Sequence, residues 1–406
     1  MSTVTPLDPS LRREQALLRL MADRYVPVAL RGLERSLTDG GAWLCFKALP
    51  GAGDGELVLE GRSERYTAMS LIGLTAQAAR GRSADVPVDR LLASLCAWAP
   101  TTAEFGDAGL VLWLLLMRND ARAEALATAI LARGDEVLRP TYVPPSMEFA
   151  YLLIGVSEAV RCGVGGDAMR RLADAVAERL ALNQDERTQL FSFAAKARRK
   201  NFLRSRVDTR LGSFASQVYP TIGFAFHARA TGDSRSSRIA RTCADRICAL
   251  QGESGQWWWV YNVVRGGPAS RYPVYSVHQH GMGPMMLCAA EIGGGHDPRY
   301  DAAIEKSFAW FDRRPELPGA AMIDASRGMI WRAIQHDDPH TTERLGLSTA
   351  EITRMSRSAW FGGLDERPLA GTAGFVCGEC RPYELGWMLL AEAMYADCVA
   401  ARALRR

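Results

Sequence analysis

The chain has 406 residues, of which 48% are hydrophobic and 23% are charged, a composition typical of soluble globular proteins. Its 49 basic and 45 acidic residues leave a net charge of +4, which is too small and too scattered for a nucleic-acid-binding protein. The nine cysteines have no regular spacing, so we expect no disulfide framework, no structural metal and a reduced, cytoplasmic setting.

The longest apolar run, residues 108–117, has about half the length of a membrane-spanning helix. We therefore expect a buried helix there and no integral membrane segment. The first fifteen residues lack the basic-then-apolar pattern of a signal peptide. The one basic cluster, residues 195–204, is explained by a solvated helix face.

Helical periodicity dominates the chain. In residues 233–250, for example, Ile239, Cys243, Ile247 and Leu250 form one apolar stripe with helical spacing. Convincing period-two patterns are scarce, so the predicted fold class is all-α. The predicted helices, about a dozen, cover residues 13–36, 66–80, 88–99, 107–118, 122–133, 146–161, 167–182, 213–230, 233–250, 275–291, 300–312 and 382–404.

A weak repeat groups these helices into pairs. Asp107, Asp167, Asp233 and Asp297 stand near predicted helix starts at intervals of 60, 66 and 64 residues, and aspartate is a favourable N-cap. Two helices per repeat give about six hairpins. We predict that residues 1–406 form a single (α/α)6 toroid around a central cavity. An open solenoid of the same hairpins is the rival arrangement.

Two long segments interrupt the helical pattern, at about 251–273 and 315–382. Loops of this length in a compact domain usually carry function. Both are rich in Trp, Tyr, His and Arg, so we expect them to form the site at the mouth of the cavity.

The first of these segments contains a motif of the form Gln-x3-Gly-x-Trp, made by Gln251, Gly255 and Trp257. It resembles the QW motif of terpenoid cyclases, which share an α/α toroid with the β-subunits of protein prenyltransferases. The resemblance implies structural roles for Gln251 and Trp257. The Asp-rich catalytic strings of the cyclases have no counterpart in this chain. In architecture the chain also resembles (α/α)6 glycan enzymes: polysaccharide lyases, uronyl C5-epimerases and unsaturated-glucuronyl hydrolases.

The densest group of chemically active side chains lies in residues 271–286. Tyr272, Tyr275, His278 and His280 fall within nine residues of one another. If a helix begins near Tyr275, then Tyr275 and His278 share one face as an i, i+3 pair, and both can exchange protons. His278 and His280 then point apart, which argues against a two-histidine metal site. The structural interpretation of this segment is a helix start packed with aromatic residues.

The second loop contributes Asp324, Arg332 and Asp337, and the start of the last helix contributes Arg381 and Glu384. Arg332 either stacks on its neighbour Trp331 or binds an anionic group of a substrate. Glu384 in a first helical turn interacts favourably with the helix dipole, or faces the cavity as an acid or base. The Cys-x2-Cys pair nearby lacks further zinc ligands.

The three consecutive tryptophans after residue 256 are predicted to divide between two roles. In an extended stretch, Trp257 and Trp259 share one side and Trp258 takes the other. With Trp257 assigned to the core, Trp258 or Trp259, together with Tyr261, is expected to face the cavity. In the middle of the chain, Gln217 and Tyr219 are further candidates for its lining.

Three classes of function remain open. The favoured one is a carbohydrate-active enzyme that acts on an acidic glycan or sugar without a cofactor, as an epimerase, lyase or hydrolase. Proton abstraction would use Tyr275, His278 and Arg332, whereas hydrolysis would use Glu384 with Asp324 or Asp337. The alternatives are a non-standard terpenoid cyclase and a non-catalytic binding toroid. The expected partner is a small-molecule or oligosaccharide substrate, and the sequence leaves a homo-oligomer open.

Overall fold

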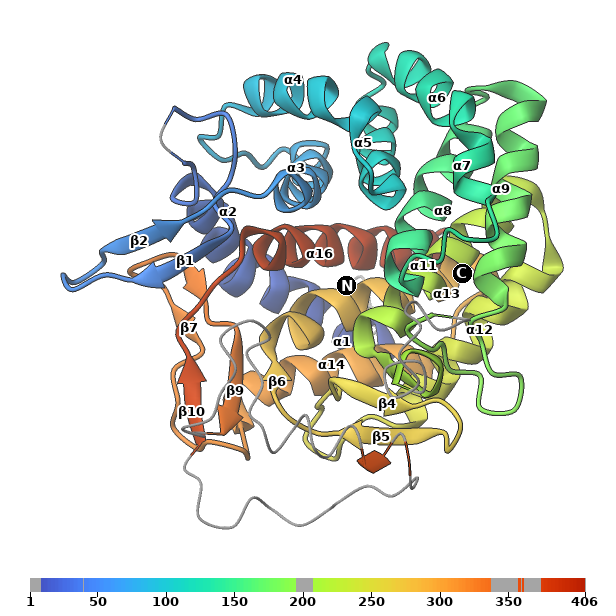
Figure 1. Cartoon of the computed structure of the whole chain (residues 1–406). Helices are drawn as coiled ribbons and strands as arrows, with labels where there is room; N and C mark the ends of the chain where they lie inside the picture. Colours follow the sequence, from blue (N-terminus) through green and yellow to red (C-terminus); the bar gives the residue numbers. More distant parts are fainter. Residues whose placement is uncertain are drawn as a thin grey trace, which may run out of the picture.

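The fold is seen in a computed structural model, drawn in Figure 1, which describes residues 9–38, 40–194, 207–336, 357–358, 360 and 374–405. Asp337 and the basic cluster at 195–204 lie outside the described residues. Helices predominate, as predicted, and the strands are few and short.

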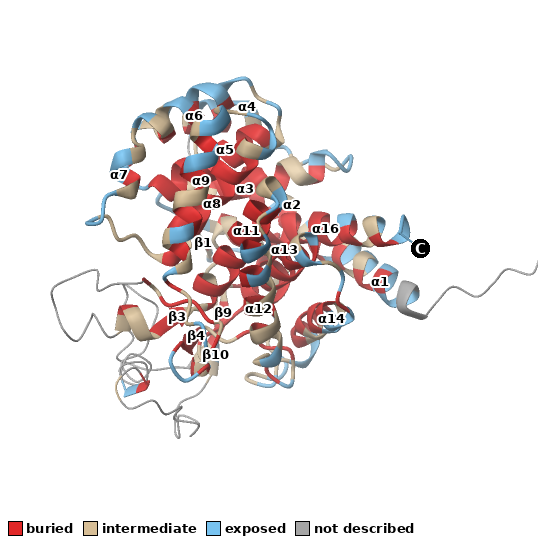
Figure 2. Ribbon diagram, turned by 90° about the vertical axis from the view of Figure 1, so that its right-hand side faces the viewer, coloured by how far each residue is buried: buried red, intermediate tan, exposed pale blue. Residues whose placement is uncertain are grey.

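Six inner helices form a closed ring. Each contacts the next in chain order, and the last contacts the first, so the helices build an (α/α)6 toroid and not an open solenoid. Most of their residues are buried (Figure 2). The inner helices are α3 (Glu64–Ala78), α5 (Phe105–Met117), α8 (Ser146–Arg161), α11 (Phe214–Thr231), α13 (Gly283–Gly294), which continues a short π-helix η3 (His278–Met282), and α16 (Pro382–Ala403).

The outer helices pack against this ring and alternate with the inner ones along the chain. They are amphipathic: in residues 234–249, for example, Ile239, Cys243 and Ile247 are buried while the opposite face is solvated. The outer helices are α1 (Pro9–Leu20), continued through η1 (Met21–Tyr25) into α2 (Val26–Glu34), then α4 (Val88–Trp98), α6 (Arg122–Ala132), α9 (Gly166–Ala181), α12 (Ser234–Ala249) and α14 (Pro298–Arg313). Short helical turns, η2 (Ala99–Thr101) and α7 (Gly134–Leu138), lie in two connections.

Glycines allow neighbouring inner helices to touch backbone to backbone. A Cβ atom on Gly73 of α3 would lie only 2.1 Å from the carbonyl oxygen of Gly386 in α16. On Gly155 of α8 it would lie 2.2 Å from the carbonyl oxygen of Gly109 in α5. Larger residues at these positions would push the ring apart, because packed interiors cannot absorb such an overlap.

The connections between helices, the two long interruptions among them, contain short antiparallel strands that the sequence did not reveal. Strands of two to four residues are too short to show a period-two pattern. One sheet has the order β3-β4-β5 and another the order β10-β9-β6, and β1-β2 and β7-β8 are hairpins. The strands are β1 (Lys47–Pro50), β2 (Leu57–Glu60), β3 (Leu211–Ser213), β4 (Val260–Asn262), β5 (Gly267–Ser270), β6 (Val274–Tyr275), β7 (Ile323–Asp324), β8 (Met329–Ile330), β9 (Ala333–His336) and β10 (Gly374–Cys377).

Two of the four predicted aspartate N-caps are confirmed. Asp233 accepts hydrogen bonds from the backbone N–H groups of the first turn of α12, and Asp297 caps α14 in the same way. Asp107 and Asp167 were predicted wrongly, because both lie inside the first turns of their helices. The side chain of Asp107 is buried and pairs with Arg65 instead.

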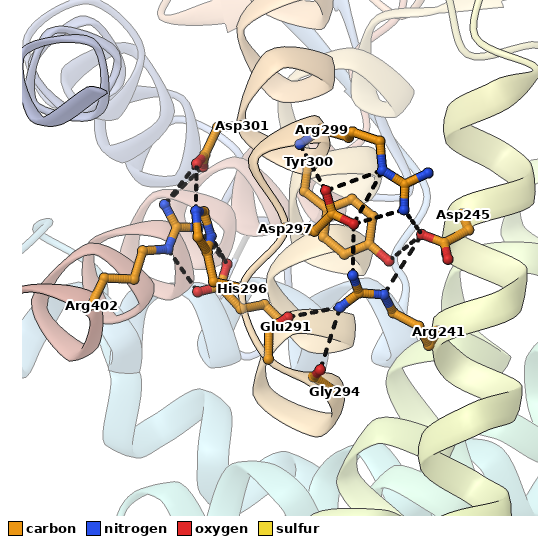
Figure 3. A network of polar contacts seen from close by, with 11 residues as sticks. Arg241, Asp245, Glu291, Gly294, His296, Asp297, Arg299, Tyr300, Asp301 and Arg402 are labelled. Atoms are coloured by element: carbon orange, nitrogen blue, oxygen red, sulfur yellow. Dashed lines mark hydrogen bonds and ion pairs between the residues drawn. The ribbon is translucent and has the colours of Figure 1, made fainter. Parts of the chain in front are cut away.

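Charged side chains fasten the end of α16 to its neighbours (Figure 3). Nε of Arg402 donates to Glu291 at 2.7 Å, and its Nη1 donates to Asp301 at 2.8 Å. The same Nη1 lies 3.4 Å from Glu14 on α1. Glu14, His296 and Asp301 bring possible metal-ligand atoms within 4.8 Å of one another, but the guanidinium already compensates the acidic charge there.

A second network in Figure 3 holds the start of α14 against α12. Arg241 lies 2.6 Å from Asp297 and 3.7 Å from Asp245, and Arg299 bridges the same two carboxylates.

None of the described helices has the length and apolar character needed to cross a membrane. All nine cysteines are free.

Candidate functional site

A cavity of about 510 Å³ lies at the N-terminal ends of the inner helices. The ends of α3, α8, α11 and α16, together with η3, supply its walls, and β6, β9 and the segments after β10 and before β4 close one side. Its lining residues are Arg65, Tyr66, Met69, Met147, Tyr151, Ser213, Ala215, Tyr219, Trp259, Tyr275, Val277, His278, Met282, Arg332, Gln335, Cys377, Glu379, Arg381 and Tyr383.

Aromatic rings form much of the wall. The rings of Tyr66 and Tyr383 lie 4.7 Å apart between centroids, and those of Tyr151 and Tyr219 lie 4.5 Å apart. Trp387 Nε1 donates to the hydroxyl of Tyr219 at 2.8 Å. Burial raises the pKa of Tyr219, so its hydroxyl stays neutral and offers a hydrogen bond, not a charge. Rings combined with neutral hydroxyls suit a ligand that has both apolar faces and hydroxyl groups.

Arg332, the residue directly before β9, reaches the cavity. Its backbone N–H donates to the carbonyl of Glu379 at 2.7 Å, and its carbonyl accepts from the N–H of Ser276 at 2.8 Å. Its guanidinium lies over the ring of Tyr275, 5.0 Å from the ring centroid. The aromatic ring that Arg332 contacts is therefore that of Tyr275 and not that of its neighbour Trp331. The pairing of β6 with β9 brings Tyr275 next to Arg332.

Glu384 lies beneath Arg332 and is completely buried. Its Oε1 accepts from Nη1 of Arg332 at 2.7 Å, and its Oε2 accepts from the backbone N–H of Arg381 at 3.2 Å in a capping box at the start of α16. Burial raises the pKa of Glu384 to about 7, while Arg332 and Arg381 act in the opposite direction. Glu384 does not line the cavity, so the geometry gives it the role of holding Arg332 in place.

Arg381 and Glu379 face the cavity as a second pair. Nε of Arg381 donates to Oε1 of Glu379 at 2.5 Å, and Nη1 donates to the hydroxyl of Tyr66 at 3.0 Å. The guanidinium also lies over the ring of Phe46, at 4.7 Å. Glu379 approaches Arg332 as well, at 3.5 Å, and therefore bridges both arginines.

A third charged group lies at the start of α3, α5 and α8. Nε of Arg65, which lines the cavity, lies 2.5 Å from Asp107, and Nη2 lies 2.9 Å from Glu148. A hydrogen bond with Glu148 raises the pKa of Glu104 to about 7, with burial and the negative charge of Glu148 adding to the effect. Glu104 therefore gains or loses its proton near neutral pH, next to the carboxyl group of Glu148.

His278 lines the cavity at the start of η3. Its Nδ1 lies 3.4 Å from the carbonyl oxygen of Trp257, which can only accept, so this nitrogen carries the proton of the neutral ring. Its ring lies 4.6 Å from Phe214 and 5.1 Å from Tyr275. Burial lowers the pKa of His278 to about 3. The imidazole thus stays neutral, with an acceptor lone pair on Nε2.

The three consecutive tryptophans have three different surroundings. Trp257 is fully buried and stacks on Phe214 at 5.8 Å, and Gln251 donates to the carbonyls of Gly255 and Ala303, which ties the turn to α14. Trp258 is half-buried outside the cavity, where its Nε1 donates to the carbonyl of Leu250 at 3.0 Å. Trp259 lines the cavity beside Tyr275, at 6.1 Å between ring centroids.

Several predicted site residues lie elsewhere. Tyr261 is completely buried in the core, and His280 is buried against Phe311, because the helical turn points it away from His278. Tyr272 is half-buried, and neither it nor Trp258 belongs to the lining. Asp324 lies in the β7-β8 hairpin, paired with Arg327 at 2.9 Å, and is also outside the lining.

Of Gln217 and Tyr219, the two residues in the middle of the chain that were expected to line the cavity, only one does so. Tyr219 lines it. Gln217 is fully buried and exchanges hydrogen bonds with the backbone N–H and carbonyl of Phe191, at 2.7 and 2.8 Å. It therefore anchors the segment before α11.

The sequence patterns did not single out Glu104, Glu148 or Glu379. A signal exists for Glu148, because it is a charged residue in the first turn of a helix and a run of mostly apolar residues, 149–156, follows it directly. Such a residue needs a buried partner, and Arg65 is that partner. Which arginine would fill this role depends on the closure of the ring, and spacing in the sequence does not reveal it.

No family model and no curated protein matches the chain. Solved structures match it over nearly its whole length. An unsaturated glucuronyl hydrolase specific for heparin has a TM-score of 0.61 at 11% identity and covers 94% of this chain and 98% of its own. The unsaturated glucuronyl hydrolase from Bacillus sp. GL1 has a TM-score of 0.56 at 14% identity, with 92% and 96% covered. A sugar epimerase from a ruminal bacterium has a TM-score of 0.56 at 10% identity, with 93% and 98% covered.

Identities this low show a shared fold alone. The matches agree with the architectural resemblance to (α/α)6 glycan enzymes and give no support to the terpenoid cyclase resemblance. The chain has the (α/α)6 toroid of these proteins.

Proposed function

We propose that the protein is a carbohydrate-active enzyme that hydrolyses a glycan whose end binds in the cavity of the toroid. The observation that carries this proposal is the group of carboxyl side chains behind Arg65, which lines the cavity: Glu148 lies 2.9 Å from Arg65, and Glu104 lies beside Glu148, although neither glutamate belongs to the lining itself. Glycoside hydrolysis commonly uses two carboxyl groups, one protonated as the acid and one ionised. A carboxyl pair that holds a proton near pH 7 is well matched to the acid role.

The ionised carboxylate of this proposal is Glu379. It lines the cavity, where it lies 2.5 Å from Arg381 and 3.5 Å from Arg332. Glu379 replaces the earlier candidates for this role, because Asp324 and Glu384 do not line the cavity and Asp337 lies outside the described residues. The aromatic walls supply stacking surfaces for sugar rings. The glucuronyl hydrolases named above have the same fold and support the choice of reaction.

Epimerisation is the second candidate. It rests on Tyr275 and His278, whose rings face the cavity next to Arg332, and on the shared fold with a sugar epimerase. Proton abstraction by His278 is disfavoured, since burial lowers the pKa of its ring to about 3. Hydrolysis therefore ranks first.

The test is a screen of oligosaccharides, including some with unsaturated glucuronyl ends, for release of reducing sugar. Glu148→Gln is expected to lower release strongly at neutral pH, because it removes the carboxylate that raises the pKa of Glu104. The protein should stay folded, because Arg65 keeps Asp107 as its ion-pair partner. Glu124→Gln on the exposed face of α6 is the matched control and should retain full activity. Deuterium incorporation into recovered sugar, without bond cleavage, would favour the epimerase instead.

A further inference from the structure

Every guanidinium that lines the cavity is already held by carboxyl groups. Arg65 contacts Asp107 and Glu148. The other two arginines face a second acidic group: Arg332 contacts Glu384 and Glu379, and Arg381 contacts Glu379. With Glu104, five carboxyl groups surround three guanidinium groups, so the described residues leave no excess of positive charge in the cavity, even with Glu104 protonated.

The helix ends do not restore a positive field. Helix N-termini attract anions through their free N–H groups, and the inner helices point these ends at the cavity. Four of the inner helices, however, carry an acidic residue in the first turn, and its negative charge already compensates the positive potential of the helix N-terminus. These residues are Glu64 in α3, Asp107 in α5, Glu148 in α8 and Glu384 in α16.

A charged sugar would have to displace one of these carboxylates. If a uronate took the guanidinium of Arg332, the fully buried Glu384 would lose its partner. Breaking a buried ion pair in this way is strongly unfavourable, because it leaves an uncompensated charge in the interior. Glu379 would in addition repel the incoming carboxylate, since it lines the cavity and bridges two of the arginines.

We infer that the sugar unit bound in the cavity is uncharged, and that the arginines serve it as hydrogen-bond donors. A guanidinium has five N–H groups, more than its carboxylate partners accept, so donors remain for sugar hydroxyls. Glu379 and the lone pair on Nε2 of His278 accept from hydroxyls in return. This inference rests on the proposed function and narrows its substrate class to neutral glycans, in place of the acidic glycan expected from the sequence.

The test measures calorimetric binding of matched sugar pairs to the whole protein: glucose with glucuronate, galactose with galacturonate, and the corresponding disaccharides. The wild-type protein is expected to bind the neutral member of a pair at least about tenfold more tightly, because the carboxylates repel the charged member. Glu379→Gln is expected to raise uronate affinity by about tenfold by freeing the charge of Arg381. Glu379→Asp keeps the charge and should keep the neutral preference.

Glu60→Gln on the exposed strand β2 makes the same change in net charge away from the cavity and should alter neither affinity. Tighter uronate binding by the wild-type protein would overturn the inference and leave the proposed function standing. Binding of neither member in any pair would overturn the proposed function and the inference with it. The wild-type comparison decides the matter even if the Glu379 variants fail to fold.

Discussion

Nη1 of Arg332 lies 2.7 Å from Oε1 of Glu384, and Glu384 is completely buried behind Arg332, outside the cavity lining. Arg332 directly precedes β9 and Glu384 lies in the first turn of α16, so the pair fastens the loop that carries Arg332 to the helical ring. Removing one partner leaves the other charge in a dry environment, where charges are costly.

We therefore predict that Arg332→Met lowers the free energy of unfolding by about 3–5 kcal/mol, the usual cost of breaking a buried ion pair. The double variant Arg332→Met, Glu384→Gln should recover part of this loss, because no unpaired charge remains. Urea unfolding of the three proteins checks both statements. Equal stability of the single and double variants would show that the pair is not coupled.

The same carboxyl group predicts a pH dependence of stability. Burial raises the pKa of Glu384 from 4.5 to about 7, so between these values the folded protein binds more protons than the unfolded chain. The free energy of unfolding should therefore fall as the pH rises from 4.5 to 7, and Glu384→Gln should flatten this part of the profile. Thermal unfolding across this pH range provides the measurement, and a profile unchanged by the substitution would contradict the assignment.

Activity should depend on the proton carried by Glu104 beside Glu148. The hydrogen bond between them raises the pKa of Glu104 to about 7, so the acid form is lost above that pH. We predict that kcat/KM declines as the pH rises through about 7 and that Glu104→Gln shifts this limb. If the alkaline limb stays in place in the variant, another group supplies the proton.

Of the three consecutive tryptophans, Trp257 is predicted to contribute most to the free energy of unfolding. Its side chain is fully buried against Phe214, so Trp257→Ala should cost about 3–5 kcal/mol of unfolding free energy. Trp258→Ala should cost much less, since Trp258 is only half-buried. Trp259→Ala should instead weaken ligand binding. Denaturant unfolding and binding measurements on the three variants separate these roles.

The helices could be predicted because each has its own apolar stripe, and helical periodicity is a local property of the sequence. The segment 146–161 was predicted with the bounds that α8 has in the structure. The short strands could not be predicted, since β6 has only two residues and its pairing with β9 depends on a segment some sixty positions later.

The candidate site could be predicted only where aromatic and charged residues cluster along the chain. Tyr275, His278, Arg332 and Arg381 line the cavity, and such residues are dense in residues 271–286 and in the second long segment. Glu148 was missed because its partner Arg65 lies eighty-three positions earlier and meets it only in the closed ring. His280 was chosen for its proximity to His278, but the helical turn buries it elsewhere.

The most direct test of the account is a crystal structure of the protein with a neutral oligosaccharide selected by the binding measurements. We predict a sugar ring in the cavity, stacked against Trp259 or Tyr275, with hydroxyls bonded to Arg332 and Glu379 and the bond to be cleaved on the side of Arg65, near Glu104 and Glu148. A lipid or isoprenoid chain in the cavity, or a sugar bound only on the outer surface of the toroid, would contradict it.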